Sequence, residues 1–380
     1  MSNPLSHHFP SPPYTSACAP LCAGGPLCPL TFPPDPLTTK AYRNNEFLNS
    51  GHARHIRILC EYEESLQRMR AAGIRATIMF FGSARSKDKE QYADAFAKAN
   101  AAIAKTSPGS DDRELAEAAL DRLKKGEWMC EYMEKIRELA KRLTSWSIDT
   151  KYRLKNQISG VSRNTAARIK HKKEAAAGKT KLHYLPHSSE DYSAAEDASP
   201  GIYVCTGGGP GFMEAANRGA YDAGGQSIGM GITLPFEHGL NPYVTPSLAF
   251  EYHYFFTRKF CMAYHMQALI VAPGGFGTFD ELFELMTLKQ TGKMQSELPV
   301  VLFGEKYWKD VINWQALADS GTINQRDIDE LCFTDDVDVA FDFITNALKS
   351  TSDPHFAECG LPDMMRSVSK EEALYNFGGD

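Results

Sequence analysis

Apolar residues along this chain follow two patterns that alternate with each other. Short apolar or β-branched runs are typical of buried strands, and they occur within 75–86, 202–205, 226–234, 268–272 and 299–304. Apolar residues at helical spacing predict helices at 54–74, 88–104, 112–147 and 212–223, around Arg258, from about Thr278, around 306–318 and at 336–349. Because strands and helices alternate, we expect an α/β fold with a mostly parallel sheet and helices on both faces.

Both ends of the chain and one internal segment depart from this alternation. Ten prolines and almost no charge occur in the first 40 residues, so we expect residues 1–44 to be a disordered leader. A transit peptide is an open alternative, although such peptides are rich in arginine and the first arginine here is Arg43. Residues 45–350 should form a single domain with a helical and basic insertion at about 110–200, followed by a C-terminal extension at 351–380.

The basic part of the expected insertion lies at 151–181. Ten lysines or arginines stand there against one acid, Glu174, which gives a local charge of about +9. No series of aromatic residues interleaves with these charges as stacking platforms would. We therefore interpret the segment as a solvated surface insertion and expect no nucleic acid as partner.

Composition excludes several classes of function. The formal net charge of -6 is mild, and 43% of the residues are hydrophobic, which is enough for a sizeable core. No apolar run reaches the roughly 20 residues that span a bilayer, so no membrane partner is expected. The nine cysteines form no CxxC pair, and Cys18, Cys22 and Cys28 lack a fourth ligand, so no metal site is expected. Without a secretory signal, a reduced cytoplasmic location is the default.

Two glycine-rich turns, at 207–211 and 274–277, lie where a predicted strand passes into a predicted helix. A dinucleotide fingerprint would need G-x-G-x-x-G, but its third glycine falls on Phe212 in one turn and on Asp280 in the other. Exposed N–H groups at such turns still suit a phosphate. Gly82 and Ser83 follow another strand and could add a hydroxyl group. The turns therefore predict a site for a mononucleotide or a sugar phosphate.

Glu281 allows two interpretations on local grounds. Thr278 and Glu281 fit the capping box S/T-x-x-E, in which the threonine caps a helix and the glutamate reaches back to the cap. Alternatively, Glu281 is a catalytic carboxylate beside the phosphate site. Glu284, one turn further on, could be structural or could line that site.

Arg258 and Lys259 are adjacent cations on an otherwise apolar helix. They could be surface side chains that snorkel from a half-buried helix. They could also bind a phosphate or other substrate oxygens, since a guanidinium holds two oxygens at once. The sequence pattern alone does not choose between these interpretations.

Two linked motifs resemble those of the LONELY GUY family of cytokinin-activating nucleoside 5′-monophosphate phosphoribohydrolases, often labelled lysine decarboxylases. The first is F-x-x-R-K-x-x-M, with Phe255, Arg258, Lys259 and Met262, and the second is P-G-G-x-G-T-x-x-E over 273–281. The resemblance extends to Gly82-Ser83, to Gly207-Gly208-Gly209 with Gly211 and Met213, and to Thr287-x-x-Gln290. It covers roughly 75–105 and 200–350.

This resemblance implies a Rossmann-like sheet that binds no dinucleotide, and an active site at the interface of a homodimer or higher homo-oligomer. Arg258 and Glu281 would be the catalytic residues, and no metal or organic cofactor would be required. The resemblance also implies a set of phosphate- and substrate-binding residues, namely Ser83, Gly207, Gly208, Gly209, Met213, Lys259, Gly274, Gly275, Gly277 and Thr278.

The implied reaction is hydrolysis of the N-glycosidic bond of a purine nucleoside 5′-monophosphate to free base and ribose 5-phosphate. Compact members of the family lack the leader, the long helix and the basic insertion, and longer relatives act as general nucleotide nucleosidases. The choice between a cytokinin riboside monophosphate and AMP or another purine monophosphate therefore stays open. One alternative is a non-catalytic carrier of a nucleotide or pterin phosphate. A pyridoxal phosphate-dependent lysine decarboxylase is disfavoured, because Lys259 lacks the acidic partner for the ring nitrogen that this cofactor needs.

Overall fold

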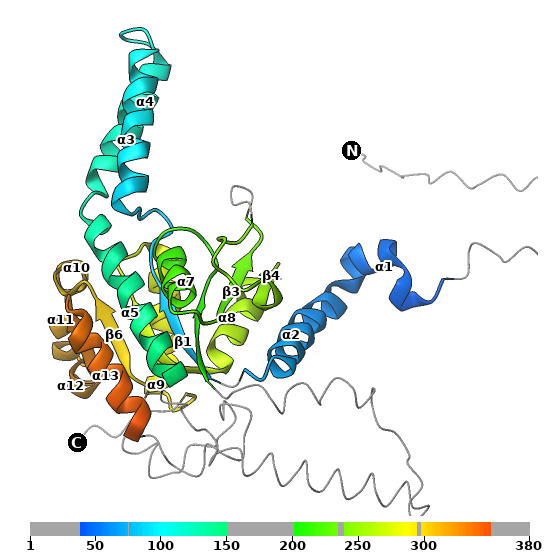
Figure 1. The fold of residues 1–380 in the computed structure, drawn as a ribbon. Coiled ribbons are helices and arrows are strands. Elements are labelled where there is room, and N and C mark those ends of the chain that lie inside the picture. The colour runs from blue at the N-terminus through cyan, green and yellow to red at the C-terminus, as the bar shows by residue number, and fades with distance from the viewer. Residues whose placement is uncertain (1–38, 75, 150–200, 235–238, 295–297, 351–380) are drawn as a thin grey trace, which may run out of the picture. The chain divides into compact units, whose positions relative to one another are not determined.

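The computed structural model describes residues 39–74, 76–149, 201–234, 239–294 and 298–350 (Figure 1). The described residues divide into two compact units, one up to Ala53 and one from Arg54 onward. The described part of the first unit consists of short helices: η1 (Ala41–Arg43), α1 (Asn45–Asn49) and η2 (Gly51–Ala53). The Asn44 side chain caps α1 by accepting a hydrogen bond from the N–H of Phe47 at 3.0 Å. The predicted site residues all belong to the second unit.

A seven-stranded sheet forms the centre of the second unit, and each pair of neighbouring strands is parallel. The strand order is β4-β3-β2-β1-β5-β6-β7. The strands are β1 (Ala76–Phe81), β2 (Ile202–Thr206), β3 (Ser227–Ile232), β4 (Ala249–Tyr252), β5 (Met266–Val271), β6 (Val300–Phe303) and β7 (Leu331–Thr334). This arrangement confirms the expected α/β, Rossmann-like fold with a mostly parallel sheet.

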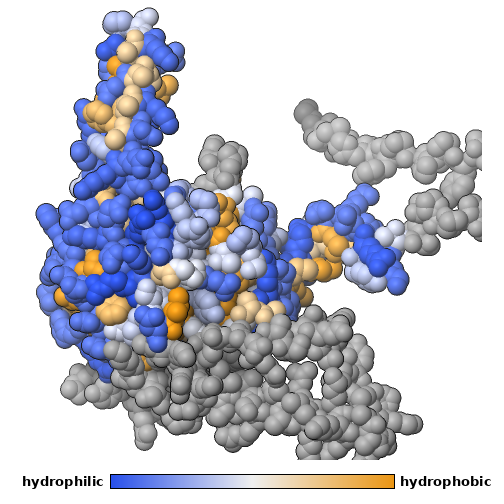
Figure 2. Space-filling model, viewed as in Figure 1, coloured by the Kyte–Doolittle hydropathy of each residue, from blue (hydrophilic) through white to orange (hydrophobic). Residues whose placement is uncertain are grey.

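The central strands are mostly apolar because helices cover both faces of the sheet. In register, Ile78 of β1 lies between Val204 of β2 and Ala268 of β5, and all three are buried. One face packs against α5 (Met129–Asp149), α7 (Phe212–Asp222) and α13 (Val337–Ser350). The opposite face packs against α2 (Arg54–Ala71), α8 (Phe255–Tyr264), α9 (Phe276–Gln290), α10 (Glu305–Val311) and α11 (Trp314–Asp319). On the side shown in Figure 2, the outer surface of these layers is mostly hydrophilic.

The long helix expected at 112–147 is in fact two helices, α4 (Asp111–Lys125) and α5. The break lies at Gly126, which ends α4. Leu115 fits the helical spacing on which that expectation rested, yet it is 67% exposed on α4, whereas Ile136 and Leu139 of α5 are buried in the core. The expected insertion at 110–200 therefore begins with a hairpin partner of α3 (Lys89–Ala104) and continues into a core helix.

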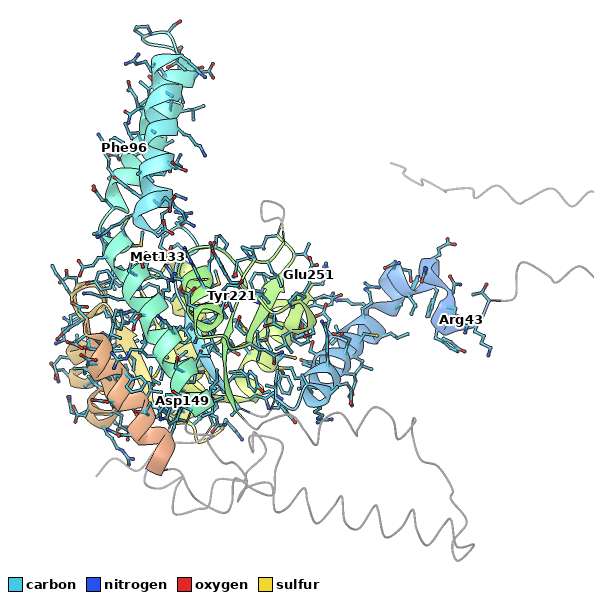
Figure 3. The ribbon with its side chains drawn as sticks, viewed as in Figure 1. Arg43, Phe96, Met133, Asp149, Tyr221 and Glu251 are labelled. Carbon is cyan, nitrogen blue, oxygen red and sulfur yellow. The ribbon has the colours of Figure 1, made fainter. Side chains whose placement is uncertain are left out.

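The packing of α5 against α7 is close because Gly219 has no side chain. A Cβ atom at Gly219 would collide with the backbone oxygen of Arg137 on α5. Figure 3 labels Met133, which is buried on α5, and Phe96, which remains partly exposed on α3. The basic segment 151–181, the leader up to residue 38 and the extension at 351–380 lie outside the described residues.

Several short elements were not predicted. They are the two edge strands β4 and β7, helix α12 (Gln325–Asp329) and the turn η4 (Pro246–Leu248). The predicted helices at 54–74, 88–104 and 212–223 are present as α2, α3 and α7 within a few residues of the expected ends. Within the described residues, no helix is both long and apolar enough to cross a membrane.

Candidate functional site

The carboxyl ends of β1, β2 and β5 bring three loops together in the middle of the sheet. The Ser83 N–H donates to the Pro273 carbonyl at 2.9 Å, and the Phe212 N–H donates to the Ser83 carbonyl at 3.2 Å. Gly82 makes this close approach possible, since a Cβ atom there would lie 2.8 Å from Cβ of Phe212. The predicted turns after the three strands are therefore neighbours, as ligand sites of parallel sheets require.

The turn 207–211 uses glycine for two reasons. Gly208 and Gly211 have φ angles of 73° and 70°, in the left-handed region that glycine adopts without strain. Gly211 also lies directly against Ser83, whose backbone oxygen would collide with a Cβ atom at Gly211. Gly211 precedes α7 without a side-chain cap. The start of α7 is thus placed against the loop after β1.

A buried polar network supports this turn and was missed by sequence reasoning. The Thr206 hydroxyl donates to Oδ1 of the fully buried Asn217 at 2.7 Å, and Nδ2 of Asn241 donates to the same oxygen at 2.9 Å. The Asn241 amide also donates to the carbonyls of Gly208 and Gly209, each at 3.0 Å. No local motif marks these residues, because they come from three separate segments.

Helix α9 begins earlier than the capping box predicted. Its N-cap is Gly275, which makes no side-chain hydrogen bond, and Thr278 is the third residue of the helix. The Thr278 side chain is buried against Gly274, where a Cβ atom would collide with it. The interpretation of Thr278 as the helix cap is therefore wrong. Tyr307 lies on α10, the helix that follows β6, and its hydroxyl donates to the Gly274 carbonyl at 2.5 Å. This hydrogen bond holds the 274–277 turn in place.

The first turn of α9 exposes N–H groups that no described residue pairs. Within the described residues, the N–H groups of Phe276, Gly277 and Thr278 have no hydrogen-bond acceptor. Gly275 and Gly277 are exposed, and a Cβ atom at either would meet no atom within 4 Å. A helix start with free N–H groups and open space around it is suited to an anion.

Arg258 is buried, with 7% of its surface exposed. Its Nε donates to the Met230 carbonyl at 2.6 Å, and its Nη1 donates to Oε1 of Glu281 at 3.0 Å. Nη2 lies over Gly207, where a Cβ atom would collide with it and would lie 2.8 Å from Sδ of Met213. Arg258 is therefore not a snorkelling surface residue. It connects β3, the 207–211 turn and α9.

Glu281 is mostly enclosed, and among the described residues its side chain pairs with that of Arg258. Burial raises the pKa of the Glu281 carboxyl group, while the positive charges of Arg258 and Lys259 oppose this rise. The net direction is upward. A carboxyl group beside a fixed cation can, when ionised, stabilise positive charge or accept a proton.

Lys259 points to α9 as well, but to different carboxylates. Its ammonium lies 2.6 Å from Oδ2 of Asp280 and 2.8 Å from Oε2 of Glu284. Burial lowers the pKa of Lys259, yet the hydrogen bonds with Asp280 and Glu284 outweigh burial and raise it overall. In this structure Lys259 therefore fastens α8 to α9, and Glu284 is its partner.

Glu61 on α2 holds the start of α8 and was also missed by sequence reasoning. Its Oε1 accepts from the N–H of His253 at 2.9 Å, and its Oε2 accepts from the Thr257 hydroxyl. Thr257 immediately precedes Arg258. Helix α8 has no cap from its own N-cap residue, Tyr254, so a carboxylate from another helix takes over that role.

The structure brings most of the predicted site residues together in two groups. Gly207, Met213, Arg258 and Glu281 adjoin one another, and Gly274 packs against Thr278. The backbone of Ser83 contacts both groups, since its N–H donates to the Pro273 carbonyl and its own carbonyl lies against Gly211. The Ser83 hydroxyl accepts a hydrogen bond from the Arg85 N–H at 3.1 Å. Within the described residues, no group of three or more potential metal ligands occurs.

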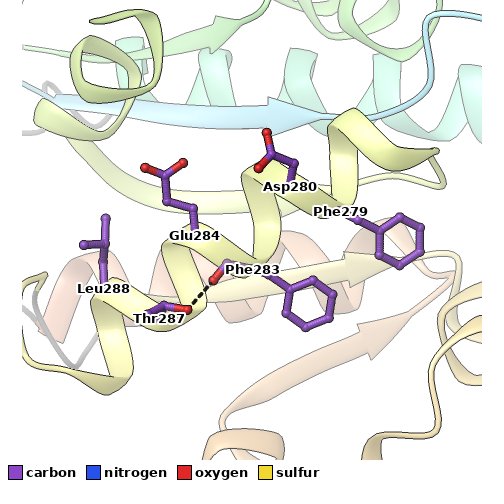
Figure 4. A pocket seen from close by; sticks show the side chains of 6 residues that line it. All are labelled: Phe279, Asp280, Phe283, Glu284, Thr287 and Leu288. Carbon is purple, nitrogen blue, oxygen red and sulfur yellow. Dashed lines mark hydrogen bonds between the residues drawn. The ribbon is translucent and has the colours of Figure 1, made fainter. Parts of the chain in front are cut away.

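A shallow pocket of about 520 Å³ lies along the outer side of α9 (Figure 4). Its lining residues are Phe279, Asp280, Phe283, Glu284, Thr287 and Leu288. It includes both carboxylates that bind Lys259, but neither Arg258 nor Glu281. Phe276, at the start of the same helix, is 96% exposed.

Glycine-rich helix starts at the carboxyl edge of a parallel sheet are typical of α/β proteins that bind phosphate groups or nucleotides. Comparison with known proteins finds one matching family model, over part of the chain. Residues 213–344, which include Arg258 and Glu281, match the family model described as "Possible lysine decarboxylase". This segment is thus similar to that LONELY GUY-like family, and the match confirms the resemblance predicted from the motifs. No curated protein matches the chain.

Proposed function

We propose that this protein hydrolyses the N-glycosidic bond of purine nucleoside 5′-monophosphates, releasing the free base and ribose 5-phosphate. The observation that carries the proposal is the buried pair of Arg258 and Glu281, with Nη1 and Oε1 3.0 Å apart, beside two glycine-rich helix starts. The family match supports a phosphoribohydrolase-type function in general.

The proposed chemistry assigns a separate task to each part of the site. Water adds its oxygen to C1′ of the ribose, the bond from C1′ to the base nitrogen breaks, and the proton that the water gives up ends on the departing base. Such a reaction passes through an oxocarbenium-like sugar, which a nearby carboxylate stabilises. Glu281 would provide that carboxylate and accept a proton from the attacking water. Arg258 would keep Glu281 ionised and oriented and hold ribose or phosphate oxygens.

The 5′-phosphate would bind at the turns 207–211 and 274–277. The free N–H groups in the first turn of α9 support this assignment, because the positive end of a helix favours an anion. Ser83 and Thr278 would add hydroxyl groups. Lys259, whose ammonium is held by Asp280 and Glu284, would act mainly by holding α8 against α9.

The ionic contacts of Lys259 also argue against a lysine decarboxylase. Pyridoxal phosphate enzymes use a lysine amine as the Schiff-base nucleophile. Lys259 carries two carboxylate partners, and its pKa is raised after burial and these hydrogen bonds are combined. A lysine held in its protonated form is a poor nucleophile. We therefore propose nucleotide hydrolysis and not lysine decarboxylation, although the matched family is described as a possible lysine decarboxylase.

The proposal is tested by incubating the protein with AMP and with isopentenyladenosine monophosphate and measuring free base. We expect base release, and we expect Glu281→Gln to lower kcat by roughly 10²-fold or more. The amide keeps an oxygen for Arg258 but cannot act as a carboxylate. Comparison of the two substrates ranks adenine against a cytokinin base.

Glu330→Gln provides a matched control. Glu330 also forms a partly buried ion pair, 2.9 Å from Nζ of Lys289 at the other end of α9. This variant should keep kcat close to wild type. Turnover by Glu281→Gln at the wild-type rate would contradict the catalytic role of Glu281. Tight AMP binding without cleavage by the wild-type protein would instead support a nucleotide carrier.

A further inference from the structure

The turn 207–211 contains a buried donor for which the described residues offer no acceptor. Gly209 is buried, and within the described residues its N–H has no hydrogen-bond acceptor. Buried backbone N–H groups are nearly always paired. An unpaired one at a candidate site therefore marks a position that a ligand oxygen or a water can fill.

The orientation of the Gly209 N–H follows from the contacts of Asn241. The Gly208 carbonyl accepts from the Asn241 backbone N–H at 2.8 Å and from its Nδ2 at 3.0 Å. In a trans peptide the carbonyl and the N–H of the next residue point in opposite directions. Since the Gly208 carbonyl faces Asn241, the Gly209 N–H faces away from it. The next peptide has no donor, because residue 210 is proline.

The Asn241 amide is itself fixed by a fully paired network. Its Oδ1 accepts from the Tyr243 N–H at 3.2 Å, so its Nδ2 must face the two glycine carbonyls and Oδ1 of Asn217. Asn217 in turn donates from Nδ2 to the Ile228 carbonyl at 3.3 Å and accepts from Thr206. Asn217 and Thr206 are both fully buried. An amide held in this way can set peptide orientation before any ligand binds.

We propose that Asn241 is a positioning residue that aims the Gly209 N–H at the 5′-phosphate of the substrate. It does so by holding the carbonyls of Gly208 and Gly209 on the opposite side of the turn. This inference rests on the proposed function and assigns to it a residue that does not itself touch the reacting atoms. Asn241 thereby determines affinity for the phosphate group, and Glu281 determines the rate of bond cleavage.

The test is the isosteric variant Asn241→Asp in the full-length chain. The change keeps the acceptor for Tyr243 but replaces the Nδ2 donor with an oxygen that faces three acceptors. We expect KM for AMP and Kd for ribose 5-phosphate to rise about tenfold or more, while kcat and the inhibition constant for adenine, which has no phosphate, stay within a few-fold of wild type. A general loss of structure would change both ligand classes.

The pH dependence gives a second readout. Protonation of the introduced carboxyl group restores a donor, so the ratio of variant to wild-type Kd for ribose 5-phosphate should shrink toward one at low pH. Ionisation of the phosphate group changes both Kd values equally, so its effect cancels in the ratio. If N241D does not fold, Asn241→Ala removes the same donor without adding charge and permits the same comparison.

Thr245→Val is the matched control. Thr245 lies on the same segment, and its hydroxyl accepts a hydrogen bond from the Ser227 N–H at 3.0 Å, away from the glycine carbonyls. It should lower stability without changing affinity for ribose 5-phosphate. Unchanged affinity in N241D, or equal losses for ribose 5-phosphate and adenine, would overturn the proposal.

Failure of the proposed function can be distinguished from failure of this inference. If the wild-type protein binds ribose 5-phosphate but cleaves no nucleotide, hydrolysis is refuted, and the Kd ratio still decides the role of Asn241. If it cleaves AMP while N241D keeps the wild-type KM, only the role of Asn241 is refuted. If it binds no phosphorylated ligand, both are refuted.

Discussion

At the scale of a single residue, burial and neighbouring positive charges act in opposite directions on the pKa of Glu281. Burial raises the pKa of its carboxyl group, and the charges of Arg258 and Lys259 reduce that rise without cancelling it. The same burial makes the ion pair costly to break, because removal of Arg258 would leave a carboxylate without its partner. Loss of one member of a buried pair typically costs about 3–5 kcal/mol. Glu281→Gln is for this reason a cleaner test than any change at Arg258.

The raised pKa predicts the pH dependence of activity. If the ionised Glu281 stabilises the sugar cation, kcat/KM should fall as the pH drops through the pKa of its carboxyl group. The acidic limb should then lie above the ordinary range of glutamate, about 4.3. A pH profile of AMP hydrolysis by the free enzyme measures this limb.

The control for this profile is Glu281→Gln on the same substrate, because the phosphate group of AMP also ionises, near pH 6. A limb that persists unchanged in the residual activity of this variant would belong to the substrate and would remove the support for Glu281. The raised pKa of Glu281 has the opposite effect on stability, which is greater at low pH than at high pH. The folded protein binds this proton more tightly than the unfolded chain, so the free energy of unfolding decreases as the pH rises from the ordinary pKa to the raised one.

Sequence reasoning found both members of the Arg258–Glu281 ion pair, but not the residues that hold them in place. Arg258 and Glu281 stand in recognisable motifs, so their partnership could be predicted from the resemblance. Asn241 and Glu61 lie in segments without a motif, and their roles exist only through contacts with distant parts of the chain. Thr278 was misassigned because the T-x-x-E pattern is local, whereas Gly274 and Tyr307 decide where the turn actually ends.

At the scale of helices and strands, the helix starts differ according to their position. The surface helices α3 and α4 begin with side-chain caps from Asp88 and Ser110. By contrast, α7 and α9 begin at Gly211 and Gly275 without such caps. A missing cap normally costs about 0.5–2 kcal/mol. Free N–H groups at the two starts beside the site are what a bound anion would satisfy.

Glu61 predicts a coupling between α2 and the orientation of Arg258. Glu61→Ala removes the acceptor for the His253 N–H and the Thr257 hydroxyl at the start of α8. We expect the free energy of unfolding to fall by about 1–3 kcal/mol and kcat to fall with it, because Arg258 follows Thr257 directly. Urea denaturation and turnover of AMP measure the two effects.

Glu63→Ala is the comparison on the same helix, since Glu63 is exposed and should change neither quantity appreciably. The double variant Glu61→Ala with Thr257→Val should lose less than the sum of the single losses, because the two side chains interact. Strictly additive losses would show that Glu61 does not act through Thr257.

The predictions of helices and strands were correct where burial requires a regular pattern of apolar residues. The strands β1, β2, β5 and β6 are apolar on both sides and were visible as continuous runs. The edge strands β4 and β7 are four residues each and only partly buried, so they carry too little pattern to be recognised. The helix expected at 112–147 had a continuous helical pattern, but Gly126 ends α4 and Leu115 faces solvent. Helical spacing alone does not reveal which apolar residues reach a core.

At the scale of the whole molecule, the two ends of the long internal segment meet. The Ser147 hydroxyl near the end of α5 accepts a hydrogen bond from the Ile202 N–H at the start of β2, at 2.8 Å. Both residues are buried. The end of α5 therefore contacts the start of β2 directly. A connection between these two ends has only a short distance to span.

This contact between α5 and β2 predicts that residues 151–190 can be removed from the enzyme. Deletion leaves Thr150 and residues 191–200 to connect α5 with β2, and a shorter connection costs less closure entropy. We expect the deletion variant to fold with an unchanged or slightly higher melting temperature and to cleave AMP with kcat and KM within a few-fold of wild type. A matched variant that replaces 151–190 with a glycine–serine linker of equal length separates the effect of length from that of charge. A large loss of turnover in both variants would mean that the basic segment belongs to the site or to an oligomer interface, whereas a loss in the deletion alone would indicate strain in the shortened connection.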